Sequence, residues 1–156
     1  MNAAPPNRIP TDGYIDLSHI NILVVDDNAN ARALIGEVLR GLGVGKVHNA
    51  ASGQAAMEIL RAGDIDMVFA DIEMPQQDGL DLVREIRKSP SPAIAGVVVV
   101  MVSAQATETR VMEAGVSGAN SFLCKPYSVL ALVRCMNEGF ASRRWVAAQE
   151  PRILEA

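Results

Sequence analysis

Aromatic residues are scarce in this chain of 156 residues: they make up 4% of it, against 49% for all hydrophobic residues together. The core must therefore be built from aliphatic side chains, chiefly those of Val, Ile, Leu, Ala and Met. This composition favours helices packed on a sheet over a β-sandwich, in which aromatic residues usually contribute more. The length suits one domain with a sizeable core.

Cysteine and positive charge are scarce as well. Two cysteines, Cys124 and Cys135, cannot form a disulfide scaffold, and no CxxC or Cys/His cluster indicates a metal site. We expect both to be reduced and to behave as small buried apolar residues. The net charge of −4 and the pI near 5.1 argue against a basic surface of the kind that binds nucleic acid.

Long hydrophobic runs are absent. The longest apolar run, residues 97–102, has six residues and is far too short to cross a bilayer. The N-terminal residues lack the apolar core of a signal peptide. We therefore expect a cytoplasmic protein that does not contact a membrane.

The rest of the chain alternates between strand-like and helix-like patterns. Short apolar or β-branched runs predict strands at 20–25, 46–50, 66–70, 97–102 and 120–124. Amphipathic patterns predict helices at 30–43, 53–63, 79–89, 107–115 and 128–140. Strands that alternate with helices through short connections predict a parallel sheet covered by helices on both faces.

Several local details follow from the same patterns. In the first helix, Leu34, Val38 and Leu42 are spaced to form one apolar face, with Ile35 and Leu39 adjacent to it. Ser52 is expected to cap the second helix, and Gly115 to end the fourth. Residues 1–18 are predicted to form an N-terminal arm, residues 19–141 the folded domain, and residues 142–156 a C-terminal tail.

Polar residues follow four of the predicted strands. Asp26 and Asp27 follow the first, Asp71 the third, Ser103 the fourth and Lys125 the fifth. In open α/β sheets the carboxyl ends of the strands line the ligand site, so these side chains should converge on one edge. Crowded carboxylates repel one another unless a cation intervenes, and Mg²⁺ prefers such oxygen ligands. A lysine beside them suits a phosphoryl oxygen.

Plainer interpretations of the same residues exist. Asp71 could be only a turn residue, and Asp26 with Asp27 could only begin a helix, where acidic residues are favourable. The convergence of five polar side chains on one edge favours the chemical interpretation.

Four motifs in this order closely resemble the receiver domain of two-component response regulators: "ILVVDDN", "FADIEMPQQDG", "VSA" and "KP". The resemblance covers residues 20–140. It implies a doubly wound (βα)₅ fold of the flavodoxin-like type, a three-layer sandwich whose five-stranded parallel sheet has the order 2-1-3-4-5.

The resemblance also assigns roles at the metal and phosphoryl site. It implies that Asp71 is the phosphoacceptor and that Lys125 neutralises and orients the phosphoryl group. It implies a Mg²⁺ cofactor held by Asp71, by Asp27 directly, by Asp26 largely through water, and by the backbone carbonyl of Glu73.

Further residues are implied to respond to the phosphoryl group. Ser103 would hydrogen-bond it, and Phe122 would be the aromatic switch residue. The positions of Glu73 and Gln105 would tune the hydrolysis of the phosphoryl group. The peptide bond before Pro126 is expected to be cis.

The function implied is that of a stand-alone response regulator, a signalling protein rather than an enzyme. It would take a phosphoryl group from a phosphohistidine of a sensor kinase or phosphotransferase. It would then signal through the face formed by residues 107–115, 120–124 and 128–140. We expect no direct binding to nucleic acid, and a monomer or a weak phosphorylation-dependent homodimer. The downstream partner and the role of the tail with Trp145 stay open.

Two alternatives stay open beside this one. The chain could be a phosphorelay intermediate that passes the phosphoryl group to a histidine on another protein. It could also be a Mg²⁺-dependent phosphohydrolase or nuclease that uses clustered carboxylates. The second alternative predicts another catalytic acid or a DxD pair, and gives no reason for Lys125, Pro126 or Phe122.

Overall fold

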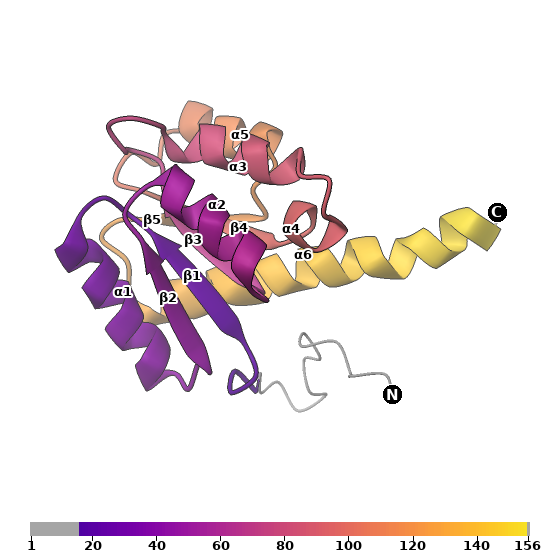
Figure 1. The fold of residues 1–156 in the computed structure, drawn as a ribbon, viewed down its shortest axis with the longest axis horizontal. Helices are drawn as coiled ribbons and strands as arrows, with labels where there is room; N and C mark the ends of the chain where they lie inside the picture. The colour runs from indigo at the N-terminus through magenta and orange to yellow at the C-terminus, as the bar shows by residue number, and fades with distance from the viewer. Residues whose placement is uncertain (1–15, 156) are drawn as a thin grey trace.

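The strands form one parallel sheet at the centre of the molecule. The computed structural model describes residues 16–155, so most of the predicted arm lies outside the described residues. The sheet has the order β2-β1-β3-β4-β5, which confirms the predicted fold (Figure 1). Its strands are β1 (Asn21–Val25), β2 (Lys46–Ala50), β3 (Met67–Asp71), β4 (Val98–Ser103) and β5 (Ser121–Cys124).

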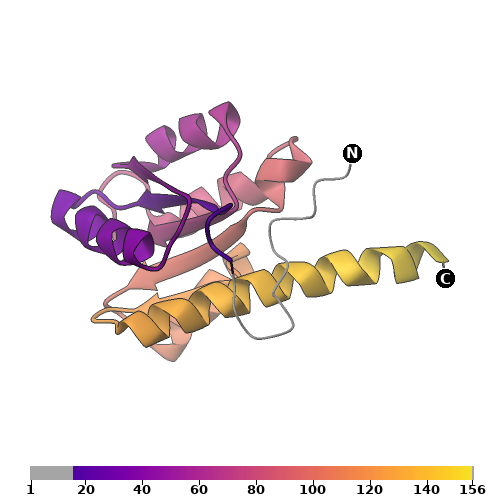
Figure 2. The same cartoon turned by 90° about the horizontal axis from the view of Figure 1, so that it is seen from below.

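Helices cover both faces of this sheet. They are α1 (Ala29–Gly41), α2 (Gly53–Ala62), α3 (Gly79–Arg87), α4 (Pro92–Ala95), α5 (Glu108–Ser117) and α6 (Val129–Glu155). One face packs against α1 and α6, and the other against α2, α3 and α5. Figure 2 shows α6, coloured orange to yellow, running along one side of the sheet and beyond it. The molecule is therefore a three-layer sandwich, as predicted.

The two faces of the sheet carry two separate cores. Along β3, Val68 faces the core on the side of α2, α3 and α5, whereas Phe69 faces the core on the side of α1 and α6. This alternation follows from the two-residue period of a strand. Every residue of β3 and β4 is buried, as expected for central strands covered on both faces.

The residue that caps α1 decides whether Asp26 and Asp27 only begin that helix. Asn28 caps α1, because its side chain accepts a hydrogen bond from the backbone N–H of Ala31. Asp26 and Asp27 are therefore not the N-cap of this helix. Ser52 caps α2 as predicted.

The predicted apolar face of α1 is partly wrong. Leu34 is 55% exposed, while Ile35 and Leu39, one turn apart, are buried against the sheet. Val38 and Leu42 lie at the edge of the same core. The buried stripe is thus centred one residue later than predicted, which turns Leu34 toward solvent.

Two helices also differ from prediction at their ends. Gly115 does not end α5, which continues to Ser117 and stops at Gly118, where a φ of 112° favours glycine. The helix predicted at 128–140 begins as expected beside Ser128, which accepts a hydrogen bond from the N–H of Ala131. It continues to Glu155, so the predicted tail prolongs α6 away from the sheet (Figure 1). The side chain of Trp145 lies outside the described residues.

Two smaller features were not predicted correctly. The connection before β4 contains a short helix, α4, with Pro92 in its first turn. Cys124, the last residue of β5, is exposed and not buried as expected, whereas Cys135 is buried as expected. Among residues 16–155, no helix is both long enough and apolar enough to cross a membrane.

Arg87, at the end of α3, connects several segments on one face of the sheet. Its guanidinium donates hydrogen bonds of 2.6 to 2.9 Å to the carbonyl oxygens of Ala95, Val97 and Gly118 and to Oδ1 of Asn120. One side chain thereby satisfies backbone groups at the end of α4, before β4 and after α5.

Replacing Arg87 by Ala should lower the free energy of unfolding by about 2–4 kcal/mol, because several partly buried acceptors lose their donor at once. Chemical denaturation measures this change. The matched control is Arg84→Ala, since Arg84 pairs only with the exposed Asp81 one turn away, and such a pair contributes about 0.5 kcal/mol. Equal losses in the two variants would contradict the role given to Arg87.

Candidate functional site

Three carboxylates meet at the carboxyl-terminal edge of the sheet. Asp26 and Asp27 follow β1, and Asp71 is the last residue of β3. Each offers an oxygen that lies within 4.8 Å of the other two. Asp26 is 2% exposed and Asp71 7% exposed, whereas Asp27 faces solvent. The neighbouring pairing of β1 and β3 brings these residues together.

Lys125 supplies the positive charge among these carboxylates. Its Nζ lies 3.4 Å from Oδ2 of Asp26 and 3.5 Å from Oδ2 of Asp71. Partial burial disfavours its charged form, but the charges of Asp71 and Asp26 prevail and raise the pKa of Lys125. The peptide bond between Lys125 and Pro126 is cis, as predicted.

The pKa of Asp71 departs clearly from the ordinary value of an aspartic acid. Burial and the charge of Asp26 raise the pKa of Asp71 from its ordinary value of 3.8 to about 6, even though Lys125 acts in the opposite direction. One of its oxygens, Oδ1, is buried and has no hydrogen-bond partner among the described residues. A carboxylate left with unsatisfied acceptor capacity beside two others fits the donor set of a hard divalent cation.

The loop after Asp71 depends on a close approach by Gly79. A Cβ at Gly79 would lie 2.3 Å from the backbone oxygen of Asp71, so no larger residue fits without a shift of the backbone. Gly79 N also donates to the carbonyl oxygen of Ile72 at 2.9 Å. Asp78 caps α3 beside it. The loop therefore returns to the end of β3 and holds Asp71 at the rim.

Ser103, Glu73 and Arg110 form a second polar group next to Asp71. Ser103 is fully buried, and its Oγ donates a hydrogen bond of 2.6 Å to Oε1 of Glu73. The same Glu73 oxygen lies 3.7 Å from Nη2 of Arg110, which extends from α5. Gln105 contributes its backbone N–H, which donates to Ser103 Oγ at 3.0 Å.

Each predicted site residue lies on or beside this edge. Phe122 lies within β5, two residues before the strand ends, where it is half-buried and packs against the core that α2, α3 and α5 cover. The structure places these residues, while their roles in phosphorylation stay predictions.

Sequence reasoning missed two basic residues. Arg32 on α1 donates to the backbone oxygen of Asp26, and Arg110 pairs with Glu73. Neither residue directly follows a strand, so the expectation that residues after the strands line the site does not include them.

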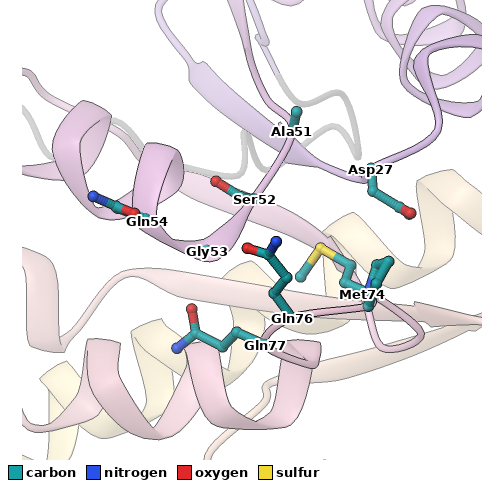
Figure 3. Close-up of a pocket in the computed structure, with 9 residues that line it drawn as sticks. Asp27, Ala51, Ser52, Gly53, Gln54, Met74, Gln76 and Gln77 are labelled. Carbon is teal, nitrogen blue, oxygen red and sulfur yellow. The ribbon is translucent and has the colours of Figure 1, made fainter.

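A polar cleft of about 490 Å³ opens beside Asp27, between the loops that follow β2 and β3. Figure 3 shows the side chains of Gln54, Gln76 and Gln77 that line it, with Met74 on the same side of the view as Asp27. The cleft leaves Asp27 accessible from solvent, so ligands can reach the acidic edge from this direction.

Known proteins resemble the chain over most of its length. A family model described as the response regulator receiver domain matches residues 22–137. Chemotaxis protein CheY-3 of Vibrio cholerae is 31% identical over 122 residues, which cover 78% of this chain and 92% of that protein. A putative response regulator from Chloroflexus aurantiacus has a TM-score of 0.72 and 29% identity, with coverage of 78% and 98%. A CheX–CheY–BeF₃–Mg²⁺ complex from Borrelia burgdorferi has a TM-score of 0.68 and 26% identity, with coverage of 75% and 86%.

The raised pKa of Asp71 predicts a pH-dependent effect of Asp71→Asn in the absence of divalent cations. Because the pKa is higher in the folded state, Asp71 disfavours folding increasingly as the pH rises from about 4 to above 6. At pH 8 with a chelator, the free energy of unfolding of Asp71→Asn should therefore exceed that of the wild type by about 1–2 kcal/mol. This is less than the whole change in the pKa of Asp71 would give, because the site adjoins solvent, which screens the charges. At pH 4 the difference should vanish.

Denaturant titrations at both pH values measure this effect. A difference that is the same at pH 4 and pH 8 would show that the amide stabilises the fold for a reason unrelated to the ionisation of Asp71.

Proposed function

Since the chain belongs to the response regulator receiver family, we propose that it is a phosphoacceptor signalling protein in which Asp71 carries the phosphoryl group. The observation that carries this proposal is the position of Asp71. It is a nearly buried carboxylate with an unpartnered oxygen, placed between two other acids and the ammonium of Lys125. The chain acts by changing its own charge state and contacts rather than by turning over a substrate.

In the transfer step, the carboxylate of Asp71 attacks the phosphorus of a phosphohistidine on a partner kinase or phosphotransferase. An oxygen–phosphorus bond forms, the phosphorus–nitrogen bond breaks, and the imidazole leaves with the electron pair of that bond. The ammonium of Lys125 lies beside Oδ2 of Asp71 and offsets charge on the transferred group. The attacking carboxylate must be deprotonated, and the charge of Lys125 favours this form by lowering the pKa of Asp71 against the effect of burial.

Asp26, Asp27, Asp71 and the backbone carbonyl of Glu73 would hold Mg²⁺ at this edge. When bound, the ion supplies positive charge that stabilises the oxygens of the phosphoryl group. Exposure of Asp27 to the polar cleft leaves room for the water ligands that Mg²⁺ usually retains.

The partner that donates the phosphoryl group is proposed to dock beside Lys125. A small apolar cleft of about 220 Å³ lies there, lined by residues of α1 and by Pro126 and Tyr127. The exposed Leu34 borders it. An apolar surface next to the reactive edge suits a protein donor, which must bring its histidine to Asp71 and then leave.

The signal is proposed to leave through α5, β5 and α6. Ser103 at the end of β4 would turn toward the phosphoryl group, and Phe122 in the neighbouring strand would follow. On α5, Met112 is 67% exposed and Val116 is 89% exposed. These apolar side chains provide contact area for a downstream protein whose affinity depends on the position of α5.

Incubation with acetyl phosphate and Mg²⁺ should add one phosphoryl group, seen as a single mass increment in the intact protein. Asp71→Asn should abolish the adduct, since the amide is not a nucleophile of comparable reactivity. Removal of Mg²⁺ by a chelator should reduce the adduct at least about tenfold.

Asp66→Asn is a suitable control for this experiment, because Asp66 lies at the opposite end of β3. It should leave the adduct unchanged. Continuous release of phosphate from a phosphoester, without any adduct, would refute the phosphoacceptor function and support the phosphohydrolase alternative.

Lys125→Ala should keep the fold but weaken the response of α5 and β5 to phosphorylation, because no other described cation lies between Asp26 and Asp71. Backbone amide NMR shifts, recorded with and without the phosphoryl mimic beryllofluoride, measure this response. Lys46→Ala at the start of β2 removes the same charge at the far edge of the sheet and serves as the control. A full-sized response in Lys125→Ala would contradict the proposal.

A further inference from the structure

Two buried side-chain atoms lack a hydrogen-bond partner among the described residues: Oδ1 of Asp71 and Nε of Arg110. The first is an acceptor at the proposed phosphorylation site, and the second is a cationic donor. Buried polar groups are nearly always paired, so an unpaired guanidinium N–H is a donor with capacity for a further contact. Glu73 interacts with both residues: its charge acts on Asp71, and its Oε1 lies 3.7 Å from Nη2 of Arg110.

Ser103 has a single proton with which to donate a hydrogen bond, and this limits its partners. A serine hydroxyl has one proton to donate, and here it goes to Oε1 of Glu73 at 2.6 Å. The oxygen of the same hydroxyl already accepts from the backbone N–H of Gln105. Ser103 therefore cannot donate to a phosphoryl group on Asp71 without releasing Glu73.

Charge then decides where the released carboxylate moves. The phosphoryl group adds a charge of about −1.5 to −2 to the site. Glu73 is close enough to Asp71 for its charge to contribute to the raised pKa of Asp71, although less than burial and Asp26 do. A carboxylate that has lost its hydrogen bond to Ser103 is repelled from this position, and the nearest described cation beyond it is Arg110.

Arg110 has the capacity to receive this carboxylate. Its Nη1 donates to Glu113 on the same helix at 3.2 Å, whereas Nη2 is 3.7 Å from Glu73, too far for a hydrogen bond. Nε and Nη2 lie on one edge of the guanidinium and together match the two oxygens of a carboxylate. One of these donors is unused and the other is loosely placed.

We propose that phosphorylation of Asp71 transfers the Glu73 carboxylate from Ser103 to Arg110, forming a bidentate pair that connects the β3–α3 loop to α5. This inference rests on the proposed phosphoacceptor function. It adds the residues, Glu73 and Arg110, through which phosphorylation of Asp71 would affect α5. Arg110 is a positioning residue: it acts on the site by removing the charge of Glu73 from the neighbourhood of the phosphoryl group.

The test is a double-mutant cycle of Arg110→Gln and Glu73→Gln, with acetyl phosphate and Mg²⁺. In Arg110→Gln, Glu73 has no cation to receive it, so the steady-state ratio of phosphorylated to free protein should fall about two- to fivefold. In the Glu73→Gln background no charge has to move, so the same substitution should leave that ratio nearly unchanged.

Hydrogen exchange supplies a second readout that does not depend on the extent of phosphorylation. With saturating beryllofluoride and Mg²⁺, amides around Arg110 in α5 should exchange about two- to fivefold more slowly in the wild type. Both single variants should lose this protection. Glu113→Gln, which removes the other partner of Arg110, should keep it and serves as the matched control.

The possible outcomes separate this inference from the proposed function. An adduct on the wild type combined with equal effects of Arg110→Gln in both backgrounds would overturn the transfer of Glu73 alone. If the slow hydrogen exchange of α5 persists in Arg110→Gln and Glu73→Gln, the transfer of Glu73 is likewise overturned. If no adduct forms on the wild-type protein, the phosphoacceptor function fails and the transfer of Glu73 fails with it.

Discussion

Repulsion among the three carboxylates at the edge of the sheet is the constraint on which the rest of the site depends. Asp26 and Asp71 are nearly buried, so their charges are poorly screened by water and require a cation nearby. Lys125 meets part of this requirement at 3.4 and 3.5 Å. The remaining negative charge makes the site receptive to a divalent ion and sensitive to any group added at Asp71.

The fold brings these charges together because it is a parallel sheet. All five strands have their carboxyl ends at the same edge, and the pairing of β1 with β3 makes Asp26 and Asp71 neighbours. Lys125 follows β5, which is separated from β3 by β4, and reaches both carboxylates through its long side chain. This is why their convergence could be predicted from the sequence: each directly follows a clear apolar run. The order of the strands followed from the family resemblance rather than from the hydrophobic pattern.

Features that depend on side-chain reach or on helix ends could not be predicted in this way. Leu34 fits an apolar stripe as well as Ile35 does, and only the packing of α1 on the sheet decides between them. Gly115 reads as a helix end, but the positive φ needed to leave the helix occurs at Gly118. Arg110 lies within a helix and reaches Glu73 through a long side chain, which leaves no pattern in the sequence.

The hydrogen bonds of Arg87 have a consequence for how α5 can respond. They hold the carbonyl of Gly118, just beyond the carboxyl-terminal end of α5, against α3 and the start of β4. At the amino-terminal end, Thr107 caps the helix, and the ion pair of Arg110 with Glu73 connects it to the β3–α3 loop. The two ends of α5 are thus held differently: by hydrogen bonds from Arg87 beyond its carboxyl-terminal end, and by a charge-dependent contact at Arg110. A change of charge at Glu73 would therefore act on α5 first through the turn that carries Arg110, and the exposed Met112 lies in the next residues of that helix.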